Sequence, residues 1–164
     1  EQILTWFNDQ VEDNSERYTA FCQAFMDGDA PKIQEMFDDY LRDMISIRDT
    51  SVRKSMKENF YHGVLLGILN FRTDWYIKSN RESGEGYGDI LIAHERARIG
   101  IIIEVKYAEN DNLEAECADA LKQIEKLHYV DALSEFEVTK VYKYAIACYR
   151  KHCMVTVTEE DLKE

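Results

Sequence analysis

Three charged residues interrupt a segment in which the chain otherwise repeats isoleucine and valine. Asp89 precedes the run ILIA, and Glu104 and Lys106 stand within the run GIIIEVKYA. An unpaired charge is costly to bury among such neighbours, so these side chains need one another or a metal ion as partners. Two carboxylates make an oxygen-lined site for a hard divalent cation, and a nearby lysine can orient or deprotonate a water molecule.

The same segment predicts two β-strands that would bring these groups together. The strands span residues 87–93 and 99–107, and a polar turn joins them. Side chains alternate across a strand, so Glu104 and Lys106 project from the same side. If the strands pair as an antiparallel hairpin, Asp89 comes to lie beside Glu104. A metal ion together with such a lysine could cleave a phosphodiester bond with metal-activated water.

The spacing also has a purely structural interpretation. An ExK triplet on a strand is short and common by chance, and Asp89, Glu104 and Lys106 could form an ion network at the edge of a sheet. Their surroundings favour a catalytic site, because a Gly-Asp pair opens the first strand, an apolar run precedes Glu104 and a helix follows it. Both interpretations remain open from the spacing alone.

A further acid lies on the helix predicted over residues 51–71. Glu58 and His62 are one turn apart there, on a face that becomes strongly apolar. Glu58 is either a solvated glutamate beside a histidine at the edge of the core, or an acid that points into a site.

The elements around the hairpin predict an α/β fold with a mixed sheet. Helical spacing covers residues 18–26, 33–44, 51–71 and 113–127, and further strands are predicted over residues 75–79, 141–147 and 152–158. The first three strands form a meander, and the helix after them crosses over to a strand that can pair in parallel. The first two helices form an antiparallel pair or a small subdomain.

Composition limits the possible classes of function. The chain has 164 residues and a net charge of −12. This charge argues against a broad basic surface that binds nucleic acid, but it permits a local basic groove. No apolar run is long enough to span a membrane, and no secretion signal is found. The motifs GxSxG and HExxH are absent, which gives little support to an unrelated hydrolase.

The four cysteines form no CxxC pair and are typical of reduced residues in a cytoplasmic protein. Cys148, His152 and Cys153 cluster near the end of the chain, but their spacing fits no common zinc module. The chain begins at Glu1 without a methionine, and we interpret it as a fragment of a longer protein, with processing as the alternative.

The order of these residues resembles the PD-(D/E)XK nuclease superfamily. More narrowly, it resembles the nuclease-like domain at the C-terminus of bacterial AAA-ATPase-like proteins. The resemblance covers residues 28–155, and the pieces that carry it are ISIRDTS, KENFYHGVLLGILN, ESGEGYGDILI, GIIIEVKYA and ALKQIEKLHY. Where a GRxD pattern would place an arginine before the aspartate, this chain has GYGD. The chain therefore lacks an arginine there that could contact the substrate phosphate.

The resemblance implies a set of metal ligands. Asp89 and Glu104 would bind Mg²⁺ or Mn²⁺, helped by the backbone carbonyl of Val105. Glu58 would be an outer ligand or would hold a metal-bound water.

The resemblance also implies roles beyond the metal. Lys106 would orient or activate the attacking water, and Gln123 would approach the site or the substrate backbone. Tyr129 follows in the same segment, where packing at the edge of the core is an equal alternative. Glu82 is a secondary acidic candidate.

The implied fold is a restriction-endonuclease-like core, a central mixed β-sheet flanked by helices, over residues 49–164. A helical extension over residues 1–48 would link it to an upstream ATPase domain. The implied substrate is nucleic acid, with DNA preferred, and assembly into an oligomer is expected. The alternative is an inactive nuclease-fold module that serves as a binding or regulatory domain for the ATPase or another protein.

Overall fold

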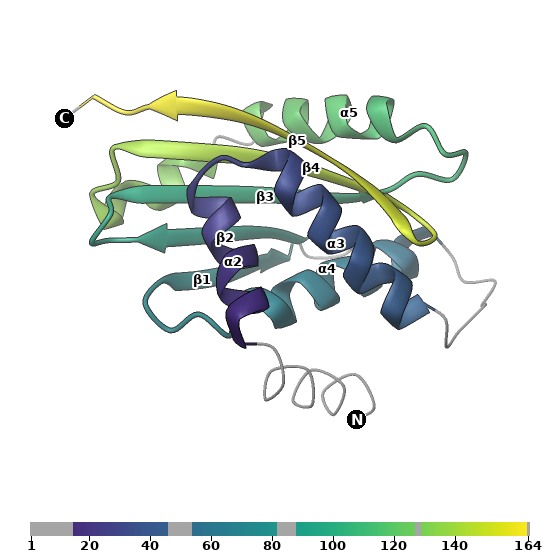
Figure 1. Ribbon diagram of the computed structural model, residues 1–164. Coiled ribbons are helices and arrows are strands. Elements are labelled where there is room, and N and C mark those ends of the chain that lie inside the picture. Colours follow the sequence, from purple (N-terminus) through teal and green to yellow (C-terminus); the bar gives the residue numbers. More distant parts are fainter. Residues whose placement is uncertain (1–14, 46–53, 82–87, 127–128, 164) are drawn as a thin grey trace.

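The computed structural model of the protein describes residues 15–45, 54–81, 88–126 and 129–163. The helices of this part are α2 (Ser15–Met26), α3 (Ala30–Ile45), α4 (Lys54–Leu69), α5 (Leu113–Lys126) and the 3₁₀ helix η1 (Tyr129–Phe136). The strands are β1 (Tyr76–Arg81), β2 (Gly88–His94), β3 (Ile99–Tyr107), β4 (Lys140–Tyr149) and β5 (His152–Asp161). They form one mixed sheet flanked by helices, which confirms the predicted α/β class (Figure 1).

The strands lie in the sheet in the order in which they occur in the chain. The pairs β1–β2, β2–β3 and β4–β5 are antiparallel, and β3–β4 is parallel. A parallel pair needs a long crossover connection, and α5 with η1 supplies it between β3 and β4. The predicted meander, crossover helix and parallel strand are therefore confirmed.

Helices cover both faces of this sheet. On one face, α2, α3 and α4 pack against inward-facing residues that include Ile101, Ile103 and Val105 of β3. On the other face, α5 and η1 pack against residues that include Ile102 and Ala145. Because side chains alternate along a strand, the odd-numbered residues of β3 face α2–α4 and the even-numbered ones face α5. Strand β3 is covered on both sides, which explains its nearly continuous apolar run.

Local signals explain where the helices begin. The carboxylate of Asp29 accepts a hydrogen bond from the Lys32 amide at 3.2 Å, and Pro31 occupies the first turn of α3. The side chain of Asn112 accepts from the Ala115 amide at 3.4 Å, just before α5. The N-terminal ends of both helices are thus capped by short polar side chains.

The first two described helices share a core with the sheet. The hydroxyl of Tyr144 on β4 donates a hydrogen bond of 2.6 Å to the carbonyl of Phe25 on α2, and the two rings are in edge contact. Helix α3 meets β5 through the carboxylate of Asp38, which accepts from the Cys153 amide at 2.6 Å. The domain boundary predicted between residues 48 and 49 lies outside the described residues.

The 3₁₀ helix η1 was not predicted from the sequence. It buries Leu133, which packs within 2.7 Å of the position that a Cβ at Gly100 would occupy. A glycine on β3 therefore lets η1 approach the sheet closely. None of the helices that the structure describes combines the length and apolar content needed to cross a membrane.

We expect the free energy of unfolding to fall as the pH rises above about 8.5, the usual thiol pKa. Burial raises the pKa of Cys22 to about 12 and holds those of Cys148 and Cys153 well above the usual value. Below the unfolded-state pKa both states are protonated, and above it only the unfolded thiols ionise. The loss should reach up to about 1.4 kcal/mol per pH unit for each thiol.

Urea denaturation under reducing conditions, at several values between about pH 8 and pH 10, measures this slope. Cys148→Ala removes one of the buried thiols and should give a shallower slope. An equal slope in the variant and the parent protein would contradict the assignment.

Candidate active site

The two predicted carboxylates lie at neighbouring positions of the β2–β3 hairpin. The paired ladder reaches Ile90 opposite Ile103, so Asp89 and Glu104 are the next residues on their strands. Both are buried, with 2% and 0% of their surface exposed. The alternation of side chains puts them on the face of the sheet that α5 covers. The register therefore puts Asp89 and Glu104 at adjacent positions just past the paired ladder, and a shared metal site between them stays a prediction.

Lys106 links Glu104 to helix α5. Its ammonium nitrogen lies 3.2 Å from Glu104 Oε1 and 2.7 Å from Gln123 Oε1. Only 13% of the Lys106 side chain is exposed. The structure therefore gathers Glu104, Lys106 and Gln123 from a strand and the following helix into one contact set, and Asp89 lies on the neighbouring strand β2, one position beyond the paired β2–β3 ladder.

The chemistry of Glu104 fits a bound cation. Within the part of the chain that the structure describes, neither carboxylate oxygen of Glu104 takes part in a hydrogen bond, although both are buried. Its one ion contact is the ammonium of Lys106. A fully buried carboxylate with so little compensation is costly, and a divalent cation would relieve that cost. Oxygen donors from Asp89 and Glu104 are the type that Mg²⁺ and Mn²⁺ accept.

Two carboxylates are enough for a magnesium-type site. Over the residues described, no group of three or more His, Cys, Asp or Glu side chains is placed to hold a metal ion. Mg²⁺ commonly binds through one or two carboxylates and keeps several water ligands or takes substrate phosphate oxygens. The same finding covers Cys148, His152 and Cys153, so the zinc alternative receives no support.

Glu58 reaches the end of β3 from the other side of the sheet. It is buried at 2% exposure on α4, and its Oε1 accepts a hydrogen bond of 3.1 Å from the Tyr107 amide. This contact fixes the backbone one residue beyond Lys106. The side chain of Val105 packs into the core on the α2–α4 face, so only its backbone could serve the metal. The metal-binding roles of Glu58 and Val105 stay predictions.

Two further sequence candidates cannot be placed. Glu82 lies outside the described residues, and of Tyr129 the structure describes the backbone in η1 but not the side chain.

A charge cluster around a buried lysine, on the sheet face that α5 covers, was not predicted from the sequence. The ammonium of Lys143 on β4 lies 2.6 Å from Glu125 Oε1 on α5 and 2.6 Å from Glu160 Oε2 on β5. Only 6% of the lysine side chain is exposed. The available signal was a lysine at an inward position of the strand VYKYAIA, which required acidic partners. This cluster ties α5 to the two last strands.

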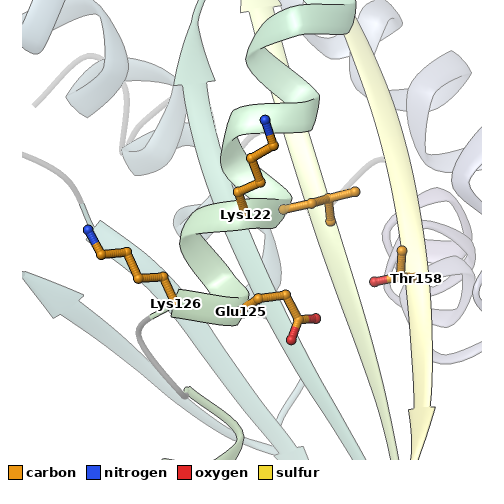
Figure 2. Close-up of a pocket in the computed structure, with 5 residues that line it drawn as sticks. Lys122, Glu125, Lys126 and Thr158 are labelled. Carbon is orange, nitrogen blue, oxygen red and sulfur yellow. The ribbon is translucent and has the colours of Figure 1, made fainter.

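An open hollow of about 660 Å³ adjoins this cluster on the outer flank of α5. Figure 2 shows it between Lys122, Glu125 and Lys126 of α5 and Thr158 of β5. Its single carboxylate already pairs with Lys143. The hollow lacks the paired acids that metal-dependent chemistry requires, so it is not the candidate active site.

The comparison with protein-family models decides the family. Residues 56–158 match the PD-(D/E)XK nuclease superfamily. The chain belongs to this superfamily. The matched part runs from α4 to β5 and contains the contact set of Glu104, Lys106 and Gln123 together with Asp89. The mixed sheet flanked by helices is consistent with a restriction-endonuclease-like fold, as predicted. A search of curated proteins finds no match to the chain.

Proposed function

We propose that this domain hydrolyses phosphodiester bonds of nucleic acid with the help of Mg²⁺ or Mn²⁺. The observation that carries the proposal is the placement of buried Asp89 and Glu104 on one sheet face, each one position beyond the paired β2–β3 ladder, with Lys106 in contact with Glu104. Membership of the PD-(D/E)XK nuclease superfamily supports it.

Each residue has a role that its contacts support. Asp89 and Glu104 would hold the cation, which when bound supplies charge neutralisation and a water molecule of lowered pKa. Lys106 would hold the attacking water and donate to the phosphate oxygens as negative charge develops there. Hydrolysis forms a bond from the water oxygen to phosphorus and breaks the ester bond, and the leaving oxygen takes a proton. Gln123 would fix the direction of the Lys106 ammonium.

A cleavage assay tests the proposal. Single- and double-stranded DNA and RNA are each incubated with the protein and Mg²⁺ or Mn²⁺, and with EDTA as a control. We expect cation-dependent cleavage that disappears in Asp89→Asn. Cleavage that survives EDTA or this substitution would contradict the proposal.

We expect Gln123→Leu to reduce the cleavage rate constant by about tenfold or more with little change in KM. Leucine has a similar size but offers no acceptor, and a hydrogen bond to a charged group contributes about 1.5–3 kcal/mol. Gln123→Glu keeps an oxygen acceptor for Lys106 and should retain most of the activity. An equal loss of cleavage rate in both variants would show that Gln123 does not act through its hydrogen bond with Lys106.

The setting of the domain is also a proposal, and it rests on the sequence resemblance. The domain would act in the bacterial cytoplasm as part of a larger protein. An upstream AAA-ATPase-like domain of the same chain would load the substrate, and DNA would be the preferred substrate. The protein would assemble into an oligomer. The four free cysteines support a reducing compartment. If the cleavage assay detects no cleavage and a calorimetric Mn²⁺ titration detects no binding, the alternative of an inactive binding or regulatory module replaces the proposal.

A further inference from the structure

The turn between β4 and β5 is the one place where the sequence has three consecutive basic residues, Arg150, Lys151 and His152. The chain as a whole carries a net charge of −12. Arg150 has a left-handed backbone with φ of 53°, and its side chain is exposed. A concentration of positive charge on an acidic protein creates a local field that attracts anions while the rest of the surface repels them.

This turn lies at the same end of strands β3 and β4 as the candidate active site. Strands β3 and β4 are parallel, and Tyr107 pairs with Cys148, so both strands end at the same edge. The Ala108 amide donates to the Cys148 carbonyl at 2.8 Å, and the Tyr61 hydroxyl of α4 donates to the Arg150 carbonyl at 2.7 Å. The turn is thus attached to the segment that directly follows Lys106.

Aromatic rings connect the turn to a further cation, Lys57. The guanidinium of Arg150 lies 5.2 Å from the Tyr149 ring, which is 6.3 Å from the Tyr107 ring. The ammonium of Lys57 on α4 lies 4.7 Å from the Tyr107 ring and 3.4 Å from its hydroxyl. These contacts hold the two cations on either side of a tyrosine row. We call Lys57, Tyr149, Arg150 and Lys151 the basic rim.

Two buried or partly buried acidic groups near the rim are engaged by backbone amides. Glu58 accepts from the Tyr107 amide and is buried. Asp38 of α3 accepts from the Cys153 amide at 2.6 Å. Among the described residues, Lys57 and Arg150 contact tyrosine rings, and no ion pair involves Lys57, Arg150 or Lys151. These cations can therefore face an anionic ligand.

We propose that the basic rim binds the phosphate backbone of a nucleic acid strand and holds it across the end of β3. The proposal rests on the proposed function for the nature of its ligand and adds the surface where that ligand is held. Charge complementarity selects a polyanion, and the position of the rim at the end of β3, against the residue that follows Lys106, selects the one that the site would cleave. Phosphate contacts of this kind fix position without reading sequence.

The test is oligonucleotide binding without cleavage. Fluorescence anisotropy of a labelled single strand is measured in EDTA over a series of salt concentrations from about 50 to 200 mM. The test variant is Arg150→Asn with Lys151→Gln, where asparagine tolerates the left-handed backbone. The matched control is Lys122→Gln with Lys126→Gln, which removes the same charge beside the hollow of Figure 2.

We expect the rim variant to raise Kd about tenfold and to reduce the magnitude of the salt slope by about 0.7 for each lost phosphate contact. The control should bind nearly as the parent protein does. Thermal unfolding of both variants checks that the fold is intact. The proposal is overturned if the rim variant binds like the parent, if the control loses as much, or if a polyglutamate chain displaces the strand at equal charge concentration.

The outcome is separable from that of the cleavage assay. If the parent binds the strand through the rim but never cleaves it, the proposed nuclease function is contradicted and the proposal that the rim binds nucleic acid is supported. If the parent cleaves and the rim variant binds unchanged, the proposed function stands and the rim is wrong.

Discussion

Glu104→Gln is expected to reduce cation-dependent cleavage by at least about a thousand-fold, which corresponds to about 4 kcal/mol of transition-state stabilisation. Glu104 is fully buried, and its oxygens make no hydrogen bond with a described residue. The amide keeps the shape of the side chain but cannot supply the negative charge that holds a divalent cation. The loss should therefore appear as weaker cation binding as well as slower cleavage.

The matched control is Glu125→Gln on α5. This carboxylate pairs with Lys143 on the same face of the sheet, but its side chain is 63% exposed and borders the outer hollow. The control should keep its activity to within a few-fold. Activity of Glu104→Gln within tenfold of the parent would contradict the assignment of Glu104 as a metal ligand, provided that thermal unfolding shows an intact fold.

The second large effect concerns Lys106→Met, which should separate cleavage from cation binding. Cleavage should fall by about a hundred-fold or more, because a positioned acid–base or charge-stabilising group commonly contributes that much. Cation affinity should stay equal or rise, since the ammonium 3.2 Å from Glu104 Oε1 competes with a cation for the same carboxylate. Opposite directions in the two measurements distinguish this role from that of a ligand.

Single-turnover cleavage and calorimetric Mn²⁺ titration of the same preparation measure the two effects. Lys122→Met, at an exposed position of α5, is the control and should change neither quantity. A fall in Mn²⁺ affinity as large as that of Glu104→Gln would mean that Lys106 supports the site structurally, and unchanged cleavage would remove it from the mechanism.

Much of the fold could be predicted from local sequence patterns. Strand β3 has the predicted bounds, because its apolar run is flanked by a turn and by polar residues at either end. The placement of Asp89 and Glu104 on one face of the sheet, just past the β2–β3 ladder, followed from alternation once the two strands were taken as a hairpin. The parallel β3–β4 pair followed from the length of the intervening helix.

What could not be predicted depends on contacts between distant segments. The 3₁₀ helix η1 has a period too short for the helical pattern and depends on the space that Gly100 leaves. The hydrogen bond from the Tyr107 amide to Glu58 joins residues 49 positions apart, and no periodicity encodes it. The same holds for Lys143, whose two acidic partners come from a helix and an edge strand.

The most direct test of the central claim is a calorimetric titration of Mn²⁺ into the parent protein and into Asp89→Asn and Glu104→Gln. We predict saturable binding to the parent that both substitutions abolish, with binding to Glu125→Gln unaffected. A parent protein that does not bind the ion, or variants that bind it as well as the parent does, would contradict a metal site built from Asp89 and Glu104.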